Sequence, residues 1–182
     1  MAGDRPGTAD PERLLAELGE SLRTQLVAAV PGWVEREVQR IVEAWDSSGP
    51  PSSEEGGDGR PAVGGGADRA AVLTEAREAG RRAAEEVGVR LRGVLSAGVD
   101  EQATTPLEVI RGVVAYPTSV LLSAGVPGVV RDSFAEARFP DDIYGLTPAS
   151  LGAVDASLTD PARAWGAAKA MAHKARHGVP RA

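Results

Sequence analysis

The chain has 182 residues and no cysteine, which excludes disulfides, thiolate catalysis and cysteine-ligated zinc or iron–sulfur sites. Apolar residue types make up 42% and charged types 25%, so the composition is that of a globular protein and not of a chain disordered throughout. The formal net charge of −6 disfavours nucleic acid as a partner.

The beginning of the chain, residues 1–9, is polar and is predicted to be a disordered tail. It contains no apolar run, so we expect no signal peptide and a cytoplasmic location. The heavy use of Ala, Gly, Val and Arg is typical of a high-GC genome, which favours a bacterial source.

Residues 10–46 are predicted to form an N-terminal helix pair. Asp10-Pro11 combines a good N-cap with a proline at the first helical position. Leucines recur every fourth residue over 14–26, and a second apolar stripe over 34–45 follows the Pro31-Gly32 break. Because two helices bury little apolar surface by themselves, we expect this pair to cover its own bundle, a second copy or a foreign helix. The hypothesis is that it is a partner-binding arm.

The next segment, residues 47–67, consists almost entirely of Gly, Pro, Ser and charged residues. Such a composition cannot bury enough surface to offset the entropy of ordering, which predicts a disordered linker. Residues 68–178 are predicted to form a helical bundle, and residues 179–182 a short tail.

Helix start and stop signals recur through the second piece. Thr105-Pro106, Thr147-Pro148 and Asp160-Pro161 repeat the N-cap and proline pattern. The near-copies 94–99 and 121–126 each place glycine before an apolar residue, as in a left-handed helix ending. The prediction is an all-α protein: a helical bundle joined to an N-terminal helix pair by a disordered Gly/Pro/Ser-rich linker.

One helix of the bundle carries a stripe of small residues. Ala76, Gly80, Ala84 and Gly88 recur every fourth position, so another helix can approach this face closely.

Residues 112–130 contain no charged residue and have the length of a membrane span. Pro117, Gly125 and Pro127 would interrupt a lipid-exposed helix and leave backbone groups unpaired. We therefore favour a buried element of the bundle, with membrane-surface contact as the alternative and a membrane span disfavoured.

The two histidines, His173 and His177, have the i,i+4 spacing of many two-histidine metal sites. No acid occurs in the residues around them, from 161 to the end. The spacing is also typical of cations at a helix C-terminus, which we favour, so no metal site and no cofactor are predicted and these two residues stay metal-ligand candidates. The carboxylate pair Asp141-Asp142 could bind a hard cation, but we favour its placement in the first turn of a short helix starting at Pro140. No nucleophile motif is found, so no catalytic residue is predicted and an enzyme is disfavoured.

Aromatic and leucine side chains supply the remaining candidates. Five of the seven aromatics and five prolines lie between residues 116 and 165, which fits either bulky filling of the core or a recognition surface. The predicted function is a non-enzymatic cytoplasmic protein-interaction module that binds a protein partner or itself. Alternatives are a membrane-surface or lipid-associated protein, and a small-ligand or metal-binding enzyme with a site in 116–165. The predicted partner-binding residues are Leu18, Leu22, Leu26, Trp33, Trp45, Tyr116, Phe134, Phe139, Tyr144 and Trp165.

Overall fold

Two long helices run the length of the molecule, and shorter helices cover them. The computed structural model describes residues 11–48, 66–101, 105–146 and 156–178. These ranges contain no β-strand, so the all-α prediction is confirmed. The helices are α1 (Pro11–Ser48), α2 (Gly66–Leu95), α3 (Pro106–Gly112), α4 (Ala115–Ser123), α5 (Ser133–Arg138) and α6 (Ala156–Arg176).

Three predicted segments fall wholly or mainly outside the described residues. These are the tail 1–9, the linker 47–67 and the tail 179–182. At its two borders the predicted linker overlaps helix, because 47–48 end α1 and 66–67 begin α2.

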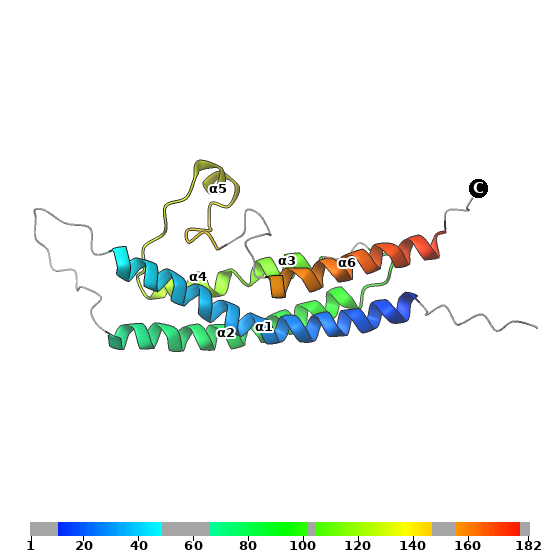
Figure 1. Cartoon of the computed structure of the whole chain (residues 1–182), viewed down its shortest axis with the longest axis horizontal. Helices are drawn as coiled ribbons and strands as arrows, with labels where there is room; N and C mark the ends of the chain where they lie inside the picture. Colours follow the sequence, from blue (N-terminus) through cyan, green and yellow to red (C-terminus); the bar gives the residue numbers. More distant parts are fainter. Residues whose placement is uncertain (1–10, 49–65, 102–104, 147–155, 179–182) are drawn as a thin grey trace, which may run out of the picture.

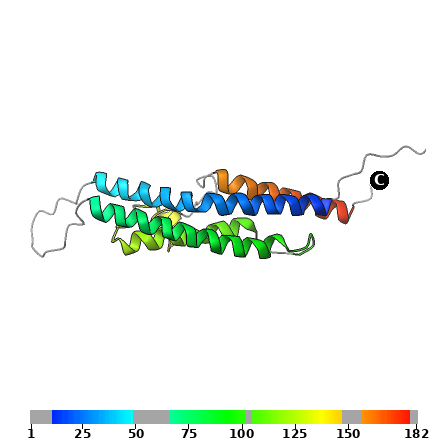
Figure 2. The same ribbon diagram turned by 90° about the horizontal axis from the view of Figure 1, so that it is seen from below.

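The helices form an elongated bundle (Figure 1). Helices α1 and α2 are antiparallel and pack against each other along most of their length. The turned view shows α6 beside α1, and α3 with α4 beside α2 (Figure 2). In chain order, α1 runs along the bundle and α2 returns antiparallel to it. Helices α3 and α4 together form the third segment, and α6 returns as the fourth.

The predicted small-residue stripe lies where α1 and α2 meet. An added Cβ on Gly80 would lie 2.9 Å from the Cα atom of Pro31, and one on Gly88 would lie 3.3 Å from Val27. Ala76 is fully buried on the same face. The prediction that another helix approaches this face closely is confirmed, because only small residues leave room for the backbone of α1.

Ion pairs flank the same interface. Arg77 Nε lies 2.8 Å from Glu35, and Arg69 Nη2 lies 2.6 Å from Glu43. These exposed pairs add little stability, about 0–1 kcal/mol each. They join α1 to α2 in the same antiparallel register as the glycine contacts do.

Residues 11–48 form one continuous helix, which corrects the predicted helix pair. Pro31 lies inside α1 and removes one backbone hydrogen bond. The apolar residues on both sides of it, Val30 and Val34, are completely buried. Burial of this stripe against α2 outweighs the local preference of proline for a break, because tertiary packing supplies most of a helix's stability.

The two predicted glycine stops behave differently. At the end of α4, Gly125 has φ +70°, its N–H donates to Leu122 O, and the Val126 N–H donates to Leu121 O, both at 3.0 Å. This is the predicted left-handed ending, with Val126 and Leu121 both buried. At the other site α2 ends at Leu95, and Gly98 does not have a positive φ.

Prolines mark two of the predicted helix starts, and a third proline lies inside a helix. Helices α1 and α3 begin at Pro11 and Pro106, as predicted. Pro161 does not start a helix, because α6 begins at Ala156 and contains this proline. The start predicted at Thr147-Pro148 lies outside the described residues.

The uncharged stretch 112–130 is buried on one face only. Val113, Val120 and Leu121 are core residues, whereas Leu122 is 55% exposed and Val130 is fully exposed. Among the helices that the structure describes, none is both long and apolar enough to cross a membrane.

Candidate functional site

The structure separates the predicted partner-binding residues into buried and accessible groups. Half of them are core residues, which corrects their assignment to a partner surface: Leu22, Leu26, Trp33, Tyr144 and Trp165. The others are exposed or half-buried: Leu18, Trp45, Tyr116, Phe134 and Phe139. Leu22 and Leu26 of the α1 leucine stripe thus pack inside this bundle, whereas Leu14 and Leu18 are exposed, so the partner-arm hypothesis loses part of its surface.

Residues 126–146, which we call the α5 loop, form a separate folded unit beside α4 (Figure 1). The Val129 N–H donates to Ile143 O at 3.0 Å, and the buried Tyr144 hydroxyl donates to Val126 O at 2.7 Å. Burial raises the pKa of the Tyr144 phenol. These bonds close the loop at its base, so its outer residues are held on a defined frame.

The carboxylate pair Asp141-Asp142 lies in turns of the α5 loop. Asp142 is buried, and its Oδ1 accepts a hydrogen bond from the Leu146 N–H at 2.8 Å. Its neighbour Asp141 is exposed. The buried carboxylate therefore has a structural role at the base of the loop.

A groove of about 620 Å³ separates the outer face of α3 and α4 from the α5 loop; we call it the α4 groove. Leu122 and Phe139 contribute its large apolar side chains, and Arg111 and Arg138 its cations. The guanidinium of Arg138 lies 5.3 Å from the Phe139 ring centre and 5.9 Å from that of Phe134. Phe134 is itself 64% exposed, so the apolar surface continues beyond the groove onto α5.

Tyr116 has a defined partner on the opposite side of α4. Its hydroxyl donates a short hydrogen bond to the Glu86 carboxylate, which raises the pKa of the Tyr116 phenol. This bond ties α4 to α2, so Tyr116 has a structural partner within the bundle.

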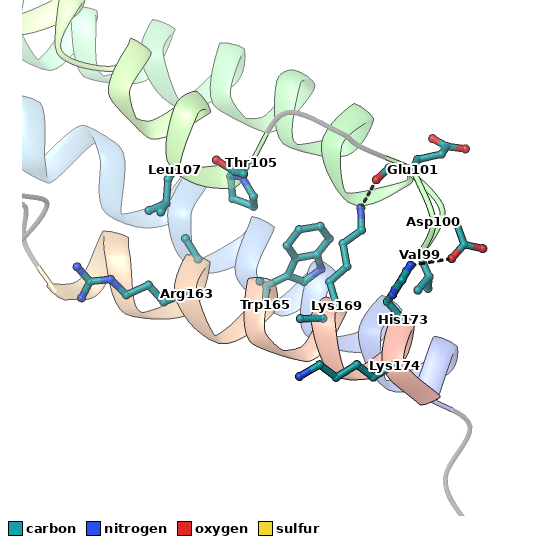
Figure 3. A pocket seen from close by; sticks show the side chains of 14 residues that line it. Val99, Asp100, Glu101, Thr105, Leu107, Arg163, Trp165, Lys169, His173 and Lys174 are labelled. Atoms are coloured by element: carbon teal, nitrogen blue, oxygen red, sulfur yellow. Dashed lines mark hydrogen bonds and ion pairs between the residues drawn. The ribbon is translucent and has the colours of Figure 1, made fainter. Parts of the chain in front are cut away.

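A second cavity, of about 630 Å³, lies between α6 and the connection from α2 to α3 (Figure 3). The Trp165 indole forms part of its wall, with Lys169 Nζ 5.4 Å from the ring centre. Lys169 Nζ donates to Glu101 O at 3.1 Å, and Arg163 and Lys174 add further positive charge. The cavity is therefore apolar at its base and cationic on the α6 side.

One end of this cavity carries a cluster of Asp100, His173 and His177. His177 Nε2 donates to Asp100 Oδ1 at 2.6 Å, and His173 Nε2 lies 3.6 Å from the same oxygen. Arg176 Nη1 lies 3.4 Å from Asp100 Oδ2. The pKa of Asp100 is lowered, chiefly by the hydrogen bond from His177, with further contributions from the nearby positive charges.

This cluster was missed because its acid lies far away in the sequence. The residues around the histidines contain no carboxylate, and Asp100 precedes His177 by 77 positions, so sequence spacing does not connect the three. The helix-terminus interpretation is compatible with the structure, since both histidines lie in or directly after the last turn of α6. No hydroxyl group among the described residues forms a hydrogen bond with either imidazole.

Comparison of the chain with protein-family models, with curated proteins and with solved structures finds no match in any of the three. Function must therefore be argued from the sites themselves.

Proposed function

We propose that the chain is a non-enzymatic protein-interaction module of the cytoplasm, and that its α4 groove binds an apolar segment of a protein partner. The observation that carries this proposal is the exposure of large apolar side chains around a groove. Leu122 at its wall is 55% exposed and Phe134 beside it is 64% exposed. Bulky apolar groups exposed together around a concave surface are typical of protein-binding sites.

The charges around the groove are mixed, because Arg111 and Arg138 line it together with Asp141 and Asp142. The lining therefore does not select a partner segment of one charge. A segment with large apolar side chains would bury them against Leu122 and Phe139. The expected ligand is thus an amphipathic segment that presents an apolar face.

The proposal is tested by capture from native lysate with tagged full-length protein, followed by mass spectrometry. Leu122→Asp and Phe134→Asp place a charge on the apolar surface, whereas Val89→Asp places one on α2 at a residue that is 66% exposed and away from the groove. We expect the same partner to be captured by the wild type and by Val89→Asp. Both groove variants should lower its affinity at least tenfold.

Two results would contradict the proposal. Equal capture by all four proteins would show that the groove does not bind the partner. Flotation of the wild type with anionic liposomes, lost in both groove variants while no protein partner is captured, would favour the membrane-surface alternative.

A further inference from the structure

The side chains of Asp100, His173 and His177 converge from two separate parts of the fold. The histidines lie one turn apart at the C-terminal end of α6, with ring centres 4.5 Å apart. Asp100 comes from the connection between α2 and α3, and faces His173 across the end of the cavity (Figure 3). One ligand atom from each residue can be chosen so that all three lie within 4.8 Å of one another.

These three atoms suit a divalent transition metal. Zn²⁺ binds imidazole nitrogen and carboxylate oxygen at about 2.0–2.2 Å, which places neighbouring ligand atoms roughly 3.3–3.6 Å apart around a tetrahedral ion. His173 Nε2 lies 3.6 Å from Asp100 Oδ1, close to that spacing, and His177 Nε2 lies 2.6 Å from the same oxygen, closer than that spacing. All three residues are exposed, so small side-chain rotations reach the required geometry.

The two oxygens of Asp100 have different partners. Oδ1 faces both histidines, while Oδ2 faces the Arg176 guanidinium at 3.4 Å. Arg176 can therefore retain Oδ2 and orient the carboxylate while Oδ1 binds the metal, as outer-shell partners do in known metal sites. An ion would replace the proton now shared between His177 Nε2 and Asp100 Oδ1, with the imidazole then protonated at Nδ1.

The surroundings favour one class of metal. Arg176, which also pairs with Glu12 at 3.3 Å, and the nearby Lys174 are positively charged and oppose a cation held by charge alone. Mg²⁺ and Ca²⁺ need several oxygen ligands, and this cluster offers one carboxylate. Zn²⁺ and its neighbours bind imidazole strongly enough to tolerate a nearby positive charge.

We propose that Asp100, His173 and His177 form a Zn²⁺ site whose fourth position is open to water. The ion would join the end of α6 to the connection between α2 and α3, two elements linked here by exposed polar contacts of Asp100 and Glu101. The inference is independent of the α4 groove, since the two sites share no residue.

Isothermal titration of the EDTA-treated full-length protein with ZnCl₂ tests this site. We expect saturable binding of one ion per chain, and no comparable binding of MgCl₂. Asp100→Asn, His173→Ala and His177→Ala should each weaken binding at least tenfold, because each removes one direct ligand. Glu101→Gln is the matched control: it neutralises the adjacent acid, whose side chain lies outside the cluster, and should leave the affinity unchanged.

A thermal readout separates a defined site from surface association. Zinc should raise the melting temperature of the wild type and of Glu101→Gln, EDTA should reverse the rise, and Asp100→Asn should abolish it. Absence of saturable binding in the wild type would overturn the proposal. Binding that persists at full strength when both histidines are replaced by alanine would also overturn it.

Discussion

Gly80 lies where α1 and α2 come closest, and the contact there is with backbone. A methyl group at this position would approach the Cα and carbonyl oxygen of Pro31 to 2.9 and 3.0 Å. Backbone atoms cannot move aside as the end of a flexible side chain can, so α1 would have to shift. Gly93, on the same helix, has no atom within 4 Å of an added Cβ.

The two glycines therefore predict opposite effects of the same substitution. Gly93→Ala should raise the free energy of unfolding by about 0.5–1 kcal/mol, because alanine is the better helix former and restricts the unfolded chain. Gly80→Ala gains the same propensity but overpacks the helix crossing, and should lower the free energy of unfolding by about 1–2 kcal/mol. Urea unfolding of the two variants measures both changes. Stabilisation by Gly80→Ala would show that α1 does not approach α2 this closely.

Sequence signals at the residue scale were reliable where the chemistry is local to one helix. The small-residue stripe and the left-handed Gly125 were both predicted from spacing alone. At the near-copy 94–99 the Ser96 hydroxyl donates to Gly93 O, and Gly98 has no positive φ. Two similar local sequences, each with a serine at the same place, thus have different endings.

At the scale of an element, helix α1 shows that tertiary packing can override a local sequence preference for a break. Pro31-Gly32 predicts a break, yet 38 residues form a single helix. The reason is visible only in the packing, since Leu26, Val30 and Val34 are completely buried on one continuous stripe. A break at Pro31 would leave half of that stripe without its partner helix, at a cost well above that of one missing hydrogen bond.

Helix α4 offers a test of one-sided burial, because neighbouring leucines lie on opposite faces. Leu121 is completely buried and Leu122 is 55% exposed. Leu121→Asp should abolish cooperative unfolding or cost more than about 3 kcal/mol, because an unpaired charge enters the core. Leu122→Asp should change the free energy of unfolding by about 0.5 kcal/mol or less.

Circular dichroism during urea titration distinguishes the two leucine variants. If the whole uncharged stretch were buried, Leu122→Asp would abolish cooperative unfolding, but the one-sided burial of α4 assigns that effect to Leu121→Asp instead. A comparable loss in the free energy of unfolding from both substitutions would mean that a partner or a second copy covers the outer face of α4.

At the scale of the whole molecule, the candidate sites depend on topology that no local signal contains. The sequence identified His173 and His177, and also Phe134 and Phe139, as residues worth attention. It did not indicate that Asp100 would meet the histidines, because this requires α6 to return beside the connection between α2 and α3. The α4 groove likewise requires the α5 loop to fold back over α4, which depends on its closing hydrogen bonds.

The placement of α1 within the bundle leads to a prediction for the intact molecule. We insert a specific protease recognition sequence in the middle of residues 49–65 and cleave the folded protein. Because α1 packs along α2 and also contacts α4 and α6, the two fragments should remain associated and elute together in native gel filtration. Their melting temperature should become dependent on protein concentration, since the helices are no longer covalently joined.

The same cleavage decides between a bundle helix and a partner-binding arm. A chain with a mutated recognition sequence is the control for the insertion and should melt independently of concentration. In denaturant the cleaved fragments should separate, and the larger one should not regain cooperative melting alone, because α2 would expose Ala76, Gly80 and Val87 to water. Separate elution of the fragments under native conditions, with cooperative melting retained by the larger one, would restore the partner-arm hypothesis for residues 10–46.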